Sequence, residues 1–252
     1  MNPQSLAARL HAARAQVTIV HVGDDLPAGI DDAYAVQAEI LRLGADAVAA
    51  WKVTGLRPQD QPGYGADRPV AGPLMARFVH DSHAVLSLSD FITPMLECEF
   101  ALRLARDLPQ RAVPYTLEEI AAAIDAVVPA FEIGDGRVPA GAPGVLRLAD
   151  SMGNGAFIIG APVPWTGQDL DAASVTLTLD GIPVGDGGGA RIWGGPLAAV
   201  QALANAQPLS APLLAGQIVT TGSATVPLAL THPVEAVADF GPLGLVHLQL
   251  RA

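Results

Sequence analysis

Apolar side chains recur at helical spacing in the first part of the chain, and this spacing predicts two helices. The first covers residues 5–16 and the second covers residues 31–42. Asp31 or Asp32 is suited to cap the second helix, and Gly44 is expected to end it. We expect this helical section either to lie against the main body or to form a contact between subunits.

Beyond residue 46, short apolar or alternating runs replace the helical spacing, which is typical of β-strands. An Asp-Gly pair at residues 180–181 adds a hairpin signal at the end of one such run. Strands are expected at residues 48–53, 83–88, 95–106, 156–160 and 175–181, around Phe131, and in the alternating strands and turns of residues 217–250.

Isolated helices and loops interrupt the predicted strands. A capping-box start predicts a helix over residues 116–127, and a proline in the favoured first-turn position starts another over residues 196–205. Glycine or proline recurs in residues 57–77 and 185–189, so both runs are expected to be loops. This order of elements indicates an α+β protein whose mixed sheet curls on itself.

The composition is that of a compact globular protein. Half of the 252 residues are apolar and 15% are charged, so the chain can bury a large core. We expect a single domain, with residues 1–45 as its helical section and residues 46–252 as its main body. The net charge of -11 argues against a nucleic-acid or anionic-membrane partner. A bound divalent cation could still reverse the field locally for an anionic substrate.

The sequence shows neither export nor membrane-insertion signals. Its first residues lack the charged start and apolar core of a signal peptide, and no apolar run is long enough to span a bilayer. The single cysteine, Cys98, cannot form an internal disulfide and is expected to be a small core residue. These features predict a cytoplasmic protein.

Two glutamates separated by one residue stand out in the predicted strand over residues 95–106. Glu97 and Glu99 would project from the same face, among apolar neighbours. Such a pair resists burial unless a cation lies between the carboxylates, and Mg²⁺ or Mn²⁺ prefers oxygen ligands. Glu132 offers a third carboxylate in a similar apolar setting. The alternative is an edge strand with one solvated face.

Lys52 is the only lysine among 14 basic residues. It lies in the apolar run of residues 48–53, where a solvated surface lysine would be unusual. A coding bias toward arginine explains the other basic residues. A partly buried ammonium can be tuned to release a proton at working pH, which a guanidinium cannot do. Lys52 is therefore a candidate for proton transfer.

Six short motifs follow one another along most of the chain. They are Trp51-Lys52-Val53, Glu97-Cys98-Glu99-Phe100-Ala101, Pro129-Ala130-Phe131-Glu132-Ile133, Ala149-Asp150-Ser151, Gly195-Pro196-Leu197-Ala198-Ala199-Val200 and Gly216-Gln217-Ile218-Val219-Thr220-Thr221-Gly222. In this order they resemble the fumarylacetoacetate hydrolase superfamily, in particular its 2-keto-4-pentenoate hydratase and 4-oxalocrotonate decarboxylase branch.

The resemblance implies a mixed β-roll as the catalytic body, with a helical N-terminal section. It also implies one Mg²⁺ or Mn²⁺ ion, a small-molecule 2-oxo acid as substrate, and a homo-oligomer. Lys52 would reach the 2-oxo or enol region of that substrate. The implied site residues are Glu97, Glu99 and Glu132 as metal ligands, Lys52 and Asp150 as catalytic residues, and Leu74, Thr221 and Gly222 as substrate-binding residues.

The chain departs from this branch at two positions. Val70 stands where hydratases of the branch carry an acid that handles a proton or the attacking water, and Ser151 replaces the usual asparagine after Asp150. Asp67 is close in sequence and is a candidate replacement for the acid. The expected metal ligands are all present, so the sequence supports metal-assisted enolisation better than it supports hydration.

These features together lead us to expect a metal-dependent lyase of aromatic-compound breakdown. It would hydrate 2-hydroxy-2,4-dienoates through a metal-bound dienolate. Three alternatives remain open: decarboxylation of a vinylogous 2-oxo acid, hydrolysis or tautomerisation of an acylpyruvate-like compound, and a non-catalytic scaffold paralogue. The carboxylates and Lys52 favour an enzyme, whereas Val70 and Ser151 favour the scaffold.

Overall fold

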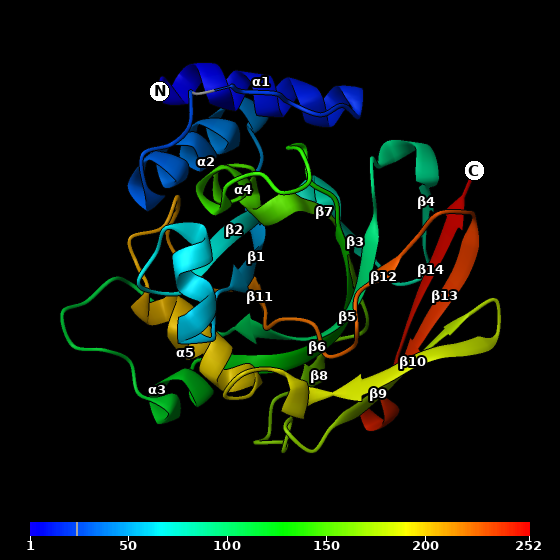
Figure 1. The fold of residues 1–252 in the computed structure, drawn as a ribbon. Coiled ribbons are helices and arrows are strands. Elements are labelled where there is room, and N and C mark those ends of the chain that lie inside the picture. Colours follow the sequence, from blue (N-terminus) through cyan, green and yellow to red (C-terminus); the bar gives the residue numbers. More distant parts are fainter. Residues whose placement is uncertain (24) are drawn as a thin grey trace.

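Two β-sheets form the body of the molecule, and helices cover the larger of them. The computed structural model describes residues 1–23 and 25–252. Figure 1 shows the larger sheet curling on itself, with the smaller sheet at one side of it. The α+β fold with a curled mixed sheet, expected from the order of elements, is confirmed.

The larger sheet carries the strands that matter for the candidate site. Its strands are β1 (Val48–Thr54), β2 (Val70–Met75), β3 (Val79–Asp81), β5 (Met95–Leu104), β6 (Ile124–Gly134), β7 (Asn154–Ile159), β8 (Val163–Pro164), β11 (Ile218–Thr220) and β12 (Leu228–Ala229). The main path through the sheet is β2-β1-β11-β5-β6-β7-β3. β1 and β11 run parallel, whereas β5 is antiparallel to both β11 and β6.

The smaller sheet is built mostly from the C-terminal part of the chain. Its strands are β4 (Ala84–Ser87), β9 (Ser174–Leu179), β10 (Ile182–Gly188), β13 (Val234–Asp239) and β14 (Leu245–Arg251). They follow the order β10-β9-β13-β14-β4. The hairpin signal is confirmed, because β9 and β10 pair antiparallel across the turn at residues 180–181.

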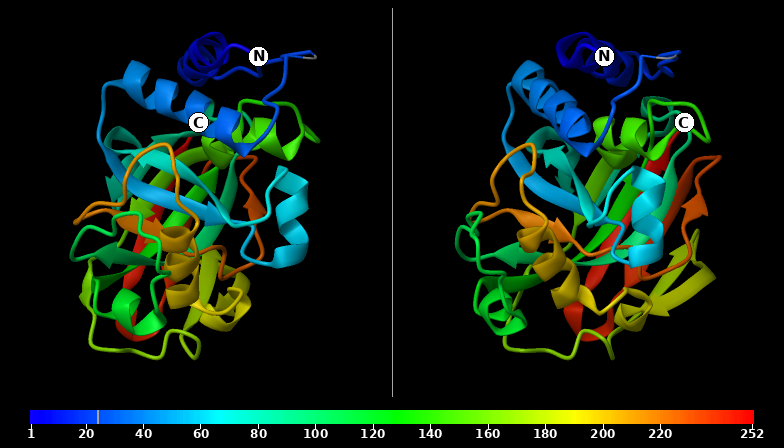
Figure 2. Two further views of the ribbon diagram at one scale, coloured as in Figure 1. Left: turned by 90° about the vertical axis from the view of Figure 1, so that its left-hand side faces the viewer. Right: turned by 60° about the vertical axis from the view of Figure 1, so that its left-hand side comes forward.

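The helices lie in two groups. They are α1 (Pro3–Gln16), α2 (Ile30–Gly44), α3 (Leu117–Ala121), α4 (Gly144–Ala149) and α5 (Pro196–Asn205). Figure 2 shows α1 outermost at one end, with α2 between it and the body, whereas α3 and α5 pack together. Within the described residues, no helix is both long and apolar enough to cross a membrane.

Helix α2 lies where the apolar spacing predicts it, but the predicted caps are wrong. The N-cap residue is Gly29, and Asp32 instead accepts a hydrogen bond of 2.9 Å from the backbone N–H of Ala28, before the helix. Gly44 is the last helical residue, and Ala45 adopts the left-handed conformation that ends the helix, with φ 49°. The sequence therefore locates this helix correctly but not its end groups.

Three other expectations are corrected by the structure. The expected loop at residues 57–77 contains β2, whose side chains are all buried and so show no alternation. Residues 185–188 of the glycine run belong to the edge strand β10 rather than to a loop. The predicted helix at residues 116–127 ends at Ala121, because the chain then enters β6 at Ile124.

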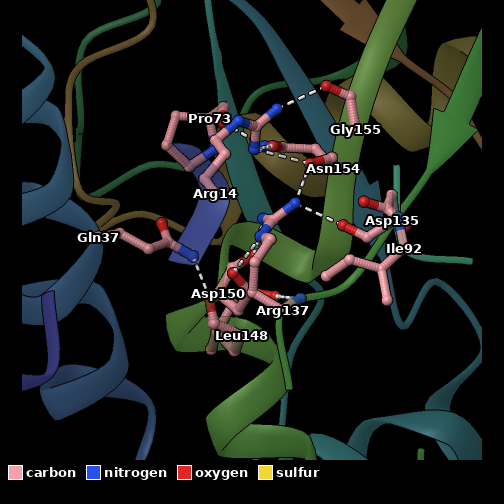
Figure 3. Close-up of polar contacts among 10 residues, drawn as sticks. All are labelled: Arg14, Gln37, Pro73, Ile92, Asp135, Arg137, Leu148, Asp150, Asn154 and Gly155. Carbon is pink, nitrogen blue, oxygen red and sulfur yellow. Dashed lines mark hydrogen bonds and ion pairs between the residues drawn. The ribbon is translucent and has the colours of Figure 1, made fainter. Parts of the chain in front are cut away.

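Buried and partly buried polar contacts connect the helical layer to the larger sheet. Arg14 of α1 donates hydrogen bonds of 2.8 Å to the carbonyl oxygen and to Oδ1 of Asn154, and one of 2.5 Å to the carbonyl of Gly155 (Figure 3). Gln37 of α2 donates to the carbonyl groups of Ala71 and Leu148, at 3.0 and 2.6 Å. These long-range bonds fix α1 and α2 over the wall formed by β2 and β7.

Candidate functional site

The three glutamates expected to bind a metal lie together on one face of the β5–β6 pair. Glu97 is the direct cross-strand partner of Glu132, and Glu99 follows two residues later, opposite Ala130. Cross-strand partners project from the same face of a sheet, so the three carboxylates converge. Glu99 is 1% exposed and Glu132 is fully buried.

Lys52 reaches this cluster from β1, which is separated from β5 by β11. Its Nζ forms an ion pair with Oε1 of Glu132, and its side chain is only 15% exposed. A Cβ placed on Gly134, at the end of β6, would lie 3.8 Å from Oε1 of Glu97 and 3.9 Å from Nζ of Lys52. The structure thus brings together the sole lysine and the three glutamates that the sequence singled out.

The cluster has an excess of negative charge in a buried setting. Burial raises the pKa of Glu99 well above its usual value, and the charges of Glu132 and Glu97 add to this rise. Burial also raises the pKa of Glu97, although the Lys52 ammonium opposes it. For Lys52, burial favours the neutral amine, but the carboxylates outweigh that effect and raise the pKa of the ammonium. One protonated lysine therefore faces three carboxyl groups.

Glu132 has the chemistry of a metal ligand. Among the described residues, none donates a hydrogen bond of good geometry to either of its buried oxygens, although Lys52 lies in ionic contact. A buried carboxylate with only one oxygen in contact with a cationic group is incompletely satisfied, and a hard divalent cation would satisfy it. Within residues 1–23 and 25–252, no three acidic, His or Cys side chains already stand in a ligating arrangement, and the Lys52 ammonium occupies the position beside Glu132. The oxygen donors fit such a cation provided that Lys52 moves aside.

A cavity of about 650 Å³ lies beside Glu97. Its wall includes Thr93, just before β5, Met95, the first residue of β5, and Ile19 and His21, which follow α1. Cavities of this size commonly hold small organic ligands. The helical section therefore contributes part of the wall of the candidate site, in addition to covering the sheet.

Asp150, expected to be catalytic, also lines this cavity but is held by Arg137. Nε of Arg137 donates to Oδ1 of Asp150 at 2.8 Å, and the backbone N–H of Arg137 donates to Oδ2 at 2.7 Å (Figure 3). The side chains of both residues are nearly buried, and burial raises the pKa of Asp150 against the opposing charge of Arg137. Both carboxylate oxygens are engaged, so the expected catalytic role of Asp150 stays a prediction.

The expected substrate-binding residues lie in three different settings. Leu74, in β2, is buried in a core cluster with Ala101 and Ala130 and is not among the residues that line the cavity beside Glu97. Thr221 donates its hydroxyl hydrogen to the carbonyl of Phe100 at 2.5 Å, which turns the hydroxyl toward the backbone of β5. The backbone N–H of Gly222 donates to Oε2 of Glu99 at 3.1 Å. Gly222 therefore contacts the carboxylate cluster through its backbone.

The candidate replacement for the missing acid does not reach the site. The Asp67 side chain is 90% exposed and lies 3.7 Å from Arg68 in a surface ion pair. Val70, at the position of the usual acid, is buried among the apolar residues under the helical layer. The substitution of the acid by Val70 is therefore accommodated by packing, and Asp67 does not compensate for it.

Sequence reasoning missed three residues near the site. Arg137 and Asp135 follow Glu132 closely in an apolar, glycine-rich loop, and Oδ1 of Asp135 accepts hydrogen bonds from the backbone N–H groups of Ile92 and Thr93, at 2.9 and 2.7 Å. Charged residues are unusual in such an apolar loop, and this feature of the sequence could have indicated them. Thr220 lies within the motif of residues 216–222, but the resemblance implies a role only for Thr221 and Gly222.

Comparison with solved structures defines the class of protein. The fold matches 4-oxalocrotonate decarboxylase from Pseudomonas putida G7, complexed with magnesium and adipate, with a TM-score of 0.87, 25% identity and coverage of 98% of this chain and 97% of that chain. Fumarylpyruvate hydrolase from Pseudomonas aeruginosa, in complex with Mn²⁺ and pyruvate, shares the fold at a TM-score of 0.58 and 15% identity, over 80% and 88% of the two chains. The architecture is that of the fumarylacetoacetate hydrolase superfamily.

Sequence comparison then narrows the class to a family. The chain is 32% identical to 2-keto-4-pentenoate hydratase from Burkholderia vietnamiensis (strain G4 / LMG 22486), over 96% of this chain and 95% of that protein. It is 30% identical to 2-hydroxyhexa-2,4-dienoate hydratase from Comamonas testosteroni, over 84% and 83%. No protein-family model matches the sequence. The chain belongs to the 2-keto-4-pentenoate hydratase family.

Proposed function

We propose that this protein is a divalent-metal-dependent hydratase of 2-hydroxy-2,4-dienoates and related unsaturated 2-oxo acids. The observation that carries the proposal is the buried Glu132 carboxylate, directly opposite Glu97 and in contact with the only lysine. Family membership supports the same reaction class, since its relatives are named for hydration of short unsaturated acids. The substrate would be a small anionic molecule.

Glu97, Glu99 and Glu132 would hold the metal ion, either Mg²⁺ or Mn²⁺. Bound there, the ion would act as a Lewis acid toward charge that develops on the C2 oxygen of the substrate. Solved structures of this fold are complexed with magnesium, calcium or manganese. Carboxylate oxygens in a buried cluster suit all these hard cations, so the choice between Mg²⁺ and Mn²⁺ is a matter for measurement.

Lys52 would hold and transfer the proton of the reaction at Nζ. Its ammonium is in ionic contact with Glu132, and its nearly buried position limits competition from solvent. A nearby divalent charge opposes the carboxylates that now raise the pKa of the ammonium, which would make the proton easier to release. Arg137 would fix the orientation of the Asp150 carboxylate at the cavity wall, where that carboxylate could contact a bound substrate.

The proposal is tested by following the ultraviolet absorbance of a 2-hydroxydienoate mixed with the purified protein. Loss of the dienol band that requires Mg²⁺ or Mn²⁺, with formation of a 4-hydroxy-2-oxo acid, is the expected result. The Glu132→Gln variant, which lacks one proposed metal ligand, is the negative control and should leave the dienol band unchanged. An unchanged band with every divalent metal tested would contradict enzymatic function and favour a scaffold.

Decarboxylation of a vinylogous 2-oxo acid is the second candidate. It is favoured by the close fold match to 4-oxalocrotonate decarboxylase and by Val70, which removes the acid expected for water addition. Product analysis separates the two reactions, because decarboxylation releases carbon dioxide and hydration adds water. We also propose a homo-oligomeric, cytoplasmic protein, and sedimentation of the purified protein would establish its subunit number.

A further inference from the structure

Thr220 carries a buried hydroxyl that nothing in the described structure satisfies. It ends β11, is fully buried, and its Oγ1 has no hydrogen-bond partner among residues 1–23 and 25–252. Neighbouring threonines are used: Thr221 donates to the carbonyl of Phe100, and Oγ1 of Thr225 accepts from the N–H of Cys98. Unsatisfied buried hydroxyls are uncommon and destabilising, so the one on Thr220 calls for an explanation.

Thr220 lies directly beside Lys52. The two residues are register partners in the parallel β1–β11 pair. Adjacent strands are about 4.8 Å apart, and register partners project from the same face, so the lysine stem and the threonine hydroxyl are neighbours on the face that carries the glutamates. A threonine hydroxyl has two acceptor lone pairs, which suit an ammonium donor.

The proposed metal site requires the Lys52 ammonium to leave its present partner. Lys52 now pairs with Glu132, and Glu132 is also a proposed metal ligand. An ammonium and a divalent cation repel each other at one buried carboxylate. A displaced ammonium still needs an acceptor, since a buried charge without a partner is strongly unfavourable. Among residues 1–23 and 25–252, Oγ1 of Thr220 is a free acceptor beside Lys52 that the metal would not use.

We propose that Thr220 is a positioning residue that accepts a hydrogen bond from Lys52 when a divalent cation displaces the lysine from Glu132. The proposal rests on the metal site proposed above and assigns a role to a residue outside the expected set. Without metal the hydroxyl is unpaired and costs stability. With metal it holds the ammonium close to the cluster, where it can serve proton transfer.

Two measurements that do not depend on turnover test this role in the Thr220→Val variant, which keeps the branched shape without the hydroxyl. Without metal, the midpoint temperature of thermal unfolding should rise by roughly 2 to 4 °C, because an unsatisfied buried hydroxyl is removed. Calorimetric titration with Mn²⁺ alone should show binding weaker by about tenfold, the effect of losing one charge-assisted hydrogen bond. Thr220→Ser should bind Mn²⁺ like the wild type, and Thr220→Ala should repeat the weaker binding if the valine variant misfolds.

A double-mutant cycle shows whether the hydroxyl acts through Lys52. In a Lys52→Met background, Thr220→Val should leave the Mn²⁺ affinity unchanged, because no ammonium needs an acceptor. Persistence of the tenfold loss in that background would overturn the proposal, as would unchanged Mn²⁺ binding in Thr220→Val when the wild type binds. A wild type that binds no divalent metal would overturn the proposed metal site and this role with it.

Discussion

Glu97 and Glu132 face each other directly across the antiparallel β5–β6 pair. Like charges in this relationship destabilise a sheet, and burial makes the repulsion stronger. The Lys52 ammonium compensates only part of the charge, because Glu99 lies on the same face. The pair therefore weakens the fold when no further cation is present, and the proposed metal ion would relieve this repulsion.

Replacing Glu132 with glutamine should abolish most of the affinity for divalent metal. Loss of a group that only supports a ligand already costs about 10 to 100-fold in metal affinity, so loss of the ligand itself should exceed about 100-fold. Titration with Mn²⁺ measures the change. Glu118→Gln, on the exposed surface of α3, is the matched control and should bind like the wild type. Tight Mn²⁺ binding by the Glu132→Gln variant would show that Glu132 is not a metal ligand.

Replacing Lys52 with alanine should lower kcat by about 100-fold or more, because a general acid–base contribution of this size is lost. Metal affinity should be kept or increased, since the ammonium no longer competes for Glu132. Lys52→Arg keeps the positive charge but cannot release a proton, so it should also turn over slowly. Steady-state kinetics with saturating Mn²⁺ provide the measurement, and near-wild-type turnover in both variants would exclude Lys52 from proton transfer.

Replacing Asp150 with alanine should destabilise the protein by about 3 to 5 kcal/mol, because the buried Arg137 guanidinium loses its counter-ion. Asp125→Ala breaks the Arg103–Asp125 pair, in which both side chains are partly exposed, and should cost at most about 1 kcal/mol. Urea unfolding measures both free energies. Equal losses in the two variants would show that the Arg137–Asp150 pair has no special structural role.

The Cys98 thiol should not react with a thiol reagent in the folded protein. Burial raises its pKa to about 12, so almost no thiolate is present at about pH 8, and the side chain is fully enclosed. Complete labelling is expected only after unfolding in denaturant. Stoichiometric labelling of the native protein would mean that the face of β5 opposite the glutamates opens to solvent.

Replacing Gly72 with alanine should destabilise the protein by about 1 to 3 kcal/mol through overpacking. A Cβ at this position would lie 2.3 Å from the carbonyl oxygen of Ser151, which is a backbone atom that cannot easily move. Gly185→Ala is the matched control, since a Cβ there meets no atom of the described residues within 4 Å. The midpoint temperature of thermal unfolding is compared between the two variants. An unchanged midpoint for Gly72→Ala would mean that the backbone at Ser151 moves to make room for the added Cβ.

Much of the fold could be predicted because local signals agreed with it. The helical spacing located α1 and α2, the alternating run located β9, and the capping box at Thr116 and Glu119 forms as expected. The strand β2 could not be predicted in this way. It is buried on both faces, so the alternation that reveals a half-exposed strand is absent, and a proline and a glycine lie within it.

The candidate site was predictable in part for a similar reason. Glu97, Glu99 and Lys52 stand out because charges within apolar strands are unusual, and the pattern alone indicates a shared face for the two glutamates. The ion pair between Arg137 and Asp150 depends on how the loops pack, and the position of the unpaired Thr220 hydroxyl depends on the register of β1 and β11. No local pattern encodes such register, so these features emerge only from the folded structure.

The carbonyl oxygen of Asn154 accepts hydrogen bonds from two guanidinium groups, those of Arg14 and Arg137 (Figure 3). Arg14 comes from the first helix, and Arg137 is the residue that holds Asp150. A displacement of the first helix would therefore act on the cavity wall through Asn154 and Gly155, the two residues that Arg14 contacts. Bulky fusions to the first helix would disturb the orientation of Asp150, so a purification tag is better attached elsewhere.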